Sequence, residues 1–121
     1  MTDVTELVDD YIAMWNETDA KQRRDLIARI WTATGSYVDP VGHGENPDAI
    51  DALVAGVQAR YPDHRFVRTS DVDGHNDRIR FGWELTPSDG PSIVKGIDFG
   101  VVAGGRLQSI TGFFDHVASA T

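Results

Sequence analysis

The chain has 121 residues, 40% hydrophobic and 25% charged, which is enough to bury the core of one soluble globular domain, residues 1–121. Its net charge of −8 lacks the basic surface that binds nucleic acid or anionic membranes, so neither is expected as a partner. It has no cysteine, which excludes disulfides and thiolate catalysis, and no apolar run of membrane-spanning length. The acidic first residues lack the regions of a signal peptide, so we expect a cytoplasmic protein.

Apolar residues at helical spacing predict an amphipathic helix near residues 3–17. Asp19 and Gln22 stand at capping-box spacing and predict the start of a second helix, which Gly35 is expected to end. The exposed face of that second helix is predicted to carry Arg23, Arg24 and Arg29.

A short strand is predicted around Ser36–Asp39, and a third helix follows it. Asn46 has the character of an N-cap, Pro47 suits the first helical position, and Pro62 closes the helix. Asp39 therefore stands at a helix-to-sheet junction, just past the second helix.

The second half of the chain is rich in β-branched and aromatic residues separated by turn residues. The four predicted strands are Arg65–Val72, Arg78–Leu85, Ser92–Val102 and Arg106–Val117. Helices followed by hairpin-connected strands predict an α+β domain, in which three helices wrap one face of a curved antiparallel sheet. Such a sheet encloses a cone-shaped pocket, and small-molecule sites favour concavities of this kind.

Two aspartates are the leading candidates for chemistry. Asp98 lies within the most apolar stretch, residues 93–102, and Asp39 directly precedes a proline. A buried carboxylate is costly unless it is paired, hydrogen-bonded or protonated, so two of them suggest a cavity with proton chemistry. The structural alternatives are a turn residue for Asp39, and for Asp98 a buried side chain bonded to the backbone or to a tyrosine.

Several fragments, taken in order, resemble the nuclear-transport-factor-2-like superfamily and within it the SnoaL-like and ketosteroid-isomerase-like group. These fragments are Tyr11-Ile12, residues 37–42, residues 96–99, residues 105–110 and residues 112–114. The resemblance implies a cone-shaped α+β fold, with Asp39 as general base and with Tyr11 and protonated Asp98 as donors to an oxyanion; the neutral carboxylic acid is a known feature of that isomerase. Tyr11 alone also suits a core position with its hydroxyl at an edge.

His75 begins a strand after a turn, so it is either a solvated hairpin residue or an acid–base group at the cavity mouth. A dehydratase-like relative pairs a histidine with an aspartate, which makes His75 and Asp98 the pair to compare. The four histidines are scattered without ligand spacing, so neither a metal nor a cofactor is expected.

Six aromatic residues are read as core, as cavity wall, or as both. They are Trp15, Trp31, Tyr37, Phe81, Trp83 and Phe114. They suit a flat, apolar or aromatic ligand. Ile97, Phe99, Thr111 and Phe113 face the other side of the sheet and suggest a homodimer. The predicted function is acid–base isomerisation or cyclisation of a small hydrophobic carbonyl compound. The alternative is a non-catalytic ligand-binding or dimerisation module of the same fold.

Overall fold

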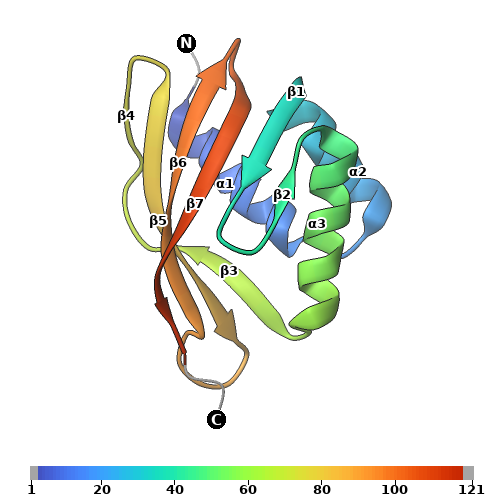
Figure 1. The fold of residues 1–121 in the computed structure, drawn as a ribbon, viewed down its shortest axis with the longest axis vertical. Helices are drawn as coiled ribbons and strands as arrows, with labels where there is room; N and C mark the ends of the chain where they lie inside the picture. The colour runs from blue at the N-terminus through green and yellow to red at the C-terminus, as the bar shows by residue number, and fades with distance from the viewer. Residues whose placement is uncertain (1–2, 119–121) are drawn as a thin grey trace.

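The computed structural model describes residues 3–118, so both ends of the predicted domain lie outside the described residues. Within these residues, three helices and seven strands form in the order helix, helix, two strands, helix, five strands (Figure 1). They are α1 (Val4–Asn16), α2 (Ala20–Ile30), β1 (Trp31–Val38), β2 (His43–Gly44), α3 (Pro47–Arg60), β3 (His64–Arg68), β4 (Asp73–His75), β5 (Arg78–Pro87), β6 (Val94–Ala103) and β7 (Arg106–Val117).

Each helix begins at a polar N-cap. The caps are Asp3, Asp19 and Asn46. Their side-chain oxygens accept hydrogen bonds of 2.8–3.2 Å from backbone N–H groups two or three residues ahead. These bonds satisfy donors that the first turn of a helix leaves free. The starts predicted at Asp19 and Asn46 are confirmed.

The predicted end of the second helix is wrong. Helix α2 ends at Ile30, and Trp31 opens β1 rather than continuing the helix to Gly35. The cause is tertiary pairing, since Trp31 lies in register with Leu107 of β7 and the following Thr-Ala-Thr segment suits a strand better than a helix. Asp39 consequently follows a strand, not a helix.

The strands form one curved, open sheet in the order β2-β1-β7-β6-β5-β3, and β4 pairs with part of β5. The α+β class, with three helices against a curved sheet, is confirmed. One pairing departs from the expected antiparallel pattern, because β1 runs parallel to β7, its neighbour in the sheet but the last of the strands in residues 3–118. Strand β3 also ends early, at Arg68, and residues expected as turn form β4.

Helix α1 crosses behind the sheet, and α2 and α3 lie beside β1 and β2 (Figure 1). The predicted alternation along β5 is confirmed, since Phe81, Trp83 and Leu85 are all buried. They pack with the apolar face of α1, which contributes Tyr11 and Trp15. This arrangement encloses space between the helices and the concave side of the sheet.

Arg23 is not on the wet face of α2. Its side chain is buried, and its Nε donates to Asp51 Oδ1 of α3 at 2.6 Å. Its Nη1 donates to the Glu17 carbonyl at 3.0 Å and to Gln58 Oε1 at 3.1 Å. A buried guanidinium needs such partners, and here they tie the end of α1 and all of α2 to α3.

Candidate active site

A cavity of about 280 Å³ lies between α1, the end of α3 and the sheet, and its wall is mostly apolar. Its lining residues are Tyr11, Ile12, Trp15, Tyr37, Asp39, Val41, Val57, Arg60, Tyr61, Phe66, Trp83, Leu85, Val94, Asp98, Phe114 and Val117. Both candidate aspartates are among them. The cavity is therefore the place where the predicted chemistry can be compared with geometry.

Asp98 lies in the middle of β6 with 3% of its surface exposed. Tyr11 Oη donates to its Oδ2 at 3.0 Å, and Trp83 Nε1 donates to its Oδ1 at 2.9 Å. Burial raises the pKa of Asp98 from 3.8 to about 7, the charge of Asp39 adds to the rise, and the two hydrogen bonds oppose it. Asp98 is thus poised between its neutral and charged forms near neutral pH.

Gly96 allows Trp83 to reach Asp98. Gly96 on β6 lies opposite Trp83 on β5, and a Cβ at Gly96 would stand 2.6 Å from Trp83 Cζ2. Any larger residue at that position would displace the indole ring, because the space is already filled. The Gly-Ile-Asp sequence therefore places an acid beside a tryptophan donor.

Tyr11 comes from the apolar face of α1 and is 1% exposed. The rings of Trp15, Trp31 and Phe81 pack edge-on around it, with centroids 5.8–6.5 Å away. Burial first, and then the charge of Asp98, raise the pKa of the Tyr11 phenol well above its ordinary value. Its hydroxyl therefore keeps its proton and acts as a hydrogen-bond donor.

Asp39 follows β1 directly and is half-buried at the cavity wall. Its Oδ1 accepts from the backbone N–H groups of Val41 at 2.8 Å and Gly42 at 2.7 Å, which builds a tight turn. Its Oδ2 accepts from Tyr37 Oη at 2.6 Å. Asp39 therefore both forms the turn and lines the cavity.

Tyr37 interacts with both acidic residues of the cavity. Burial, the charge of Asp98 and the hydrogen bond to Asp39 all raise the pKa of the Tyr37 phenol. Like Tyr11, it remains a protonated donor. Each carboxyl in the cavity thus has its own phenol.

Gly112 of β7 is the backbone position at which these groups meet. It pairs with Asp98 across the sheet, and a Cβ added there would lie 3.0 Å from Asp98 Oδ1. The same Cβ would lie 3.2 Å from Asp39 Cβ and 3.4 Å from Tyr37 Oη. Two carboxyls and a phenol therefore converge over one residue without a side chain. Gly112 lies opposite Asp98 in the register of β6 and β7. The residue types alone do not show this pairing, so the sequence did not point to Gly112.

Of the six aromatic residues predicted for the wall, four line the cavity. They are Trp15, Tyr37, Trp83 and Phe114. Trp31 and Phe81 do not, because they lie in the closed core behind Tyr11 with 1% exposure each. Their part is to support Tyr11 rather than to contact a ligand.

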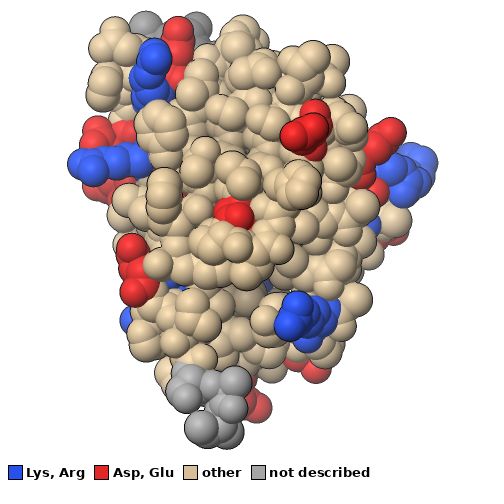
Figure 2. Space-filling view, viewed as in Figure 1, with Lys and Arg blue, Asp and Glu red and all other residues tan. Residues whose placement is uncertain are grey.

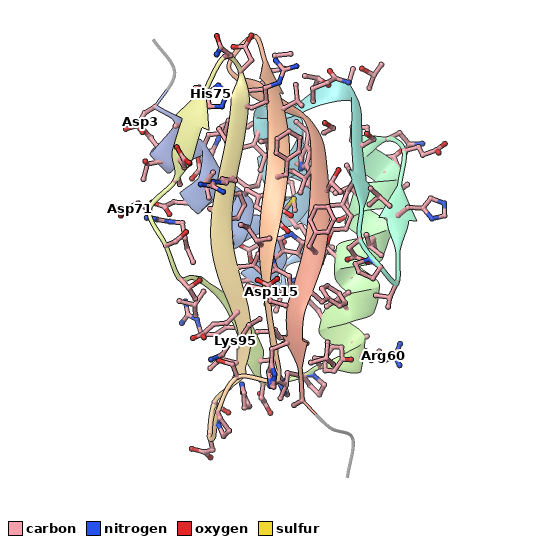
Figure 3. All side chains as sticks on the ribbon, turned by 60° about the vertical axis from the view of Figure 1, so that its left-hand side comes forward. Asp3, Arg60, Asp71, His75, Lys95 and Asp115 are labelled. Atoms are coloured by element: carbon pink, nitrogen blue, oxygen red, sulfur yellow. The ribbon has the colours of Figure 1, made fainter. Side chains whose placement is uncertain are left out.

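His75 does not meet Asp98, so the proposed His75–Asp98 pair does not form. The histidine is exposed on β4, in register with Arg78 and hydrogen-bonded to Asn76, and it lines a separate shallow depression. Figure 3 shows it at the opposite end of the molecule from Arg60, which does line the cavity. Extra pairing between β4 and the start of β5 takes His75 away from the centre of the sheet.

Sequence reasoning missed the cavity residues at the end of α3. Val57 lines the cavity from α3, and Arg60 and Tyr61 follow it at helical spacing onto the same wall. That spacing was the available signal. The charge of Arg60 and the proximity of Pro62 concealed it.

Within residues 3–118, no three side chains of the metal-binding types gather at one place. The helices described for these residues are all too short or too polar to cross a membrane.

The fold and its cavity define an α+β protein of the nuclear-transport-factor-2-like class. A SnoaL-like family protein from Agrobacterium tumefaciens, whose name proposes an isomerase, is 34% identical over 91% of this chain and 95% of that one, with a TM-score of 0.87. The chain belongs to the SnoaL-like family. No protein-family model and no curated protein sequence matches it.

Two more distant structures share the fold. One is a proposed SnoaL-like polyketide cyclase from Jannaschia sp., with 17% identity, a TM-score of 0.69, and coverage of 92% of this chain and 86% of that one. The other, from Catenulispora acidiphila, has a ketosteroid-isomerase-like fold and was solved in complex with trimethylamine. It is 17% identical, with a TM-score of 0.73 over 93% of this chain and 85% of that one.

Proposed function

We propose that the protein transfers a proton beside a carbonyl group in a small apolar substrate, as an isomerase or a cyclase does. The observation that carries this proposal is the convergence of Asp39 and Asp98 over Gly112 at one side of an apolar cavity. One carboxyl with a shifted pKa and a second carboxyl in the same cavity are a common arrangement for acid–base catalysis. The names of the relatives, an isomerase and a polyketide cyclase, agree with this class of reaction.

Asp39 is assigned as the general base. Asp39 lines the cavity, its Oδ2 accepts from Tyr37, and its Oδ1 is held by the turn. The turn fixes the carboxyl in place, so the base is oriented before a substrate binds. It would remove a proton from the carbon next to the carbonyl, and return it at another carbon when the reaction is an isomerisation.

Tyr11 and Asp98 are assigned to the developing oxyanion. Oδ1 of Asp98 accepts a hydrogen bond from Trp83. When Asp98 is protonated, the proton therefore sits on Oδ2, which faces the Tyr11 hydroxyl. Once protonated, Asp98 donates to Tyr11 and the hydrogen bond between them reverses. The hydroxyl hydrogen of Tyr11 is then free for the substrate oxygen, where a preorganised donor stabilises an enolate.

The test is turnover of β,γ-unsaturated ketones, both bicyclic and steroidal, followed by ultraviolet absorbance as the conjugated enone forms. Asp39→Asn keeps the shape of the side chain and should lower kcat about 10²- to 10⁴-fold, the usual contribution of a general base. Asp71→Asn is the matched control, since Asp71 is exposed and outside the cavity (Figure 3). Full activity in Asp39→Asn would refute the assignment.

A second candidate is ligand binding without reaction. The observation that favours it is that both oxygens of Asp39 and both oxygens of Asp98 already accept hydrogen bonds from the protein. In that case the native protein binds these enones without converting them, and Asp39→Asn leaves the Kd unchanged. The same experiment therefore separates the two functions.

A further inference from the structure

Arg60 is the only cationic residue among those that line the cavity, within the part of the chain that the structure describes. It is the last residue of α3 and is exposed, so its guanidinium stands at the rim rather than in the depth. The other charged groups of the lining, Asp39 and Asp98, are both acidic. The cavity is therefore polarised, with positive charge at its rim and acids farther in.

Arg60 has no carboxylate partner among residues 3–118. The ion pairs formed there use Lys21 and four other arginines, Arg23, Arg29, Arg68 and Arg80. The nearest group recorded for Arg60 is the ring of Tyr61, with its centroid 6.0 Å from the guanidinium carbon. In a chain with 19 acidic residues, an unpaired arginine at a cavity rim is available to a ligand.

The rim of the cavity and the buried acid Asp98 lie at different positions along β6 and β7. Asp98 pairs with Gly112, and four residues away on β6 the cavity residue Val94 pairs with Val117, which is 58% exposed. Four residues of strand span about 13 Å, so the two pairs mark two ends of an elongated space. Figure 3 places Arg60 at the same end of the molecule as Lys95, the neighbour of Val94.

We propose that the substrate carries an anionic group, a carboxylate in its simplest form, at the end opposite its reacting carbonyl, and that Arg60 binds this group. The inner acids repel an anion, and the arginine attracts it, so the ligand can enter in one orientation only. The carbonyl then reaches Tyr11 while the apolar body of the ligand contacts the walls. This inference rests on the cavity being the ligand site of the proposed function, but not on turnover.

The probes are 6-acetyl-2-naphthoate and its methyl ester, which share a carbonyl and a flat apolar body and differ in the charge at the far end. Binding is measured at low ionic strength by quenching of tryptophan fluorescence, since Trp15 and Trp83 line the cavity. The native protein should bind the acid more tightly than the ester. Arg60→Gln should weaken binding of the acid about three- to fivefold, as expected for an exposed ion pair, and leave the ester unchanged. Arg60→Glu should weaken binding of the acid further.

Arg24→Gln is the matched control, because it removes the same charge from an exposed position on α2 outside the cavity. It should change neither Kd. Equal losses for acid and ester in Arg60→Gln, or no loss for the acid, would overturn the inference. Asp39→Asn should keep the preference for the acid, so a failure of the anion site and a failure of the catalytic proposal give different results.

Discussion

At the scale of single residues, the burial of Asp98 has an energetic cost as well as a use. A carboxyl whose pKa is raised on folding is more easily ionised in the unfolded chain. The phenol of Tyr11 and the indole of Trp83 offset part of this cost by donating to it. Buried Asp98 therefore lowers the free energy of unfolding near neutral pH, where its acid–base role would operate.

The pH dependence of stability follows from this shift. Because the pKa of Asp98 rises from 3.8 to about 7, the unfolded chain releases this proton first, and the free energy of unfolding falls as the pH increases from about 4 to about 7. Asp98→Asn keeps the shape and both hydrogen-bond partners and removes the titration. We expect it to match the native protein near pH 4 and to be more stable by roughly 2–4 kcal/mol at pH 8.

Urea unfolding of both proteins across this pH range measures the difference. Other carboxyls titrate in both proteins alike, so only the difference between the two curves reports on Asp98. A constant difference from pH 4 to pH 8 would show that Asp98 has an ordinary pKa.

The sequence predicts the inward direction of Asp98, because alternation along a strand is a strict rule. It predicts only a cavity wall for Tyr37, whose bond to Asp39 depends on how β1 ends and turns. Of the two readings of His75, the solvated hairpin residue is the correct one, because strand pairing and not residue type sets its position. Contacts made across the sheet, such as those at Gly112, require the register and not the residue types.

At the scale of elements, the helices are joined by a polar cluster under the cavity. Gln58 of α3 accepts one hydrogen bond from Arg23 and donates to the backbone carbonyls of Trp15 and Glu17 at the end of α1. Asn16 exchanges two hydrogen bonds of 2.8–2.9 Å with the backbone of Phe66 in β3. These bonds set where Trp15 and Phe66 stand as cavity walls.

Arg23→Met should therefore lower the free energy of unfolding by about 2–4 kcal/mol, because it leaves Asp51 and two other acceptors without their donor. Arg24→Met, at the neighbouring exposed position, should change it by less than about 0.5 kcal/mol. Chemical unfolding of both variants measures the contrast. Equal effects would mean that the cluster adds nothing beyond the surface charge.

The error about Arg23 has a simple origin. Arg23, Ile27 and Ile30 are four and three residues apart, so helical spacing placed the arginine on the buried face. Its charge argued for solvent, and only the position of Asp51 on another helix explains the outcome. Helix starts, in contrast, depend on local caps, and the two starts predicted from caps, at Asp19 and Asn46, are confirmed.

At the scale of the whole molecule, the outer face of the sheet carries an apolar patch on β6 and β7. Ile97 pairs with Phe113 and Phe99 with Thr111 across β6 and β7, and the two phenylalanines are 43–53% exposed. In the view of Figure 1, β6 and β7 lie beside β1 and α3, and Figure 2 shows that the charged residues on this side of the molecule lie mainly toward its edges, with an acidic group near the middle. A surface of this kind suits burial against a second copy of the chain.

We expect a homodimer formed through this face. Phe113→Lys should shift the protein toward the monomer in sedimentation velocity, because a charge in the centre of an apolar interface is costly to bury. Ala52→Lys adds the same charge at an exposed position on α3 and should leave the dimer intact. A native protein that sediments as a monomer at high concentration would end the proposal.

The parallel pairing of β1 with β7 also determines when function can arise during synthesis. Val38 takes its register from Thr111, and Asp39 stands next to it, so the assigned base is positioned by β7, the last of the described strands. Loop closure over such a separation is slow compared with local hairpins. Synthesis must pass β7 before the cavity is complete, and any premature stop upstream of β7 leaves Asp39 without the strand that positions it beside Asp98.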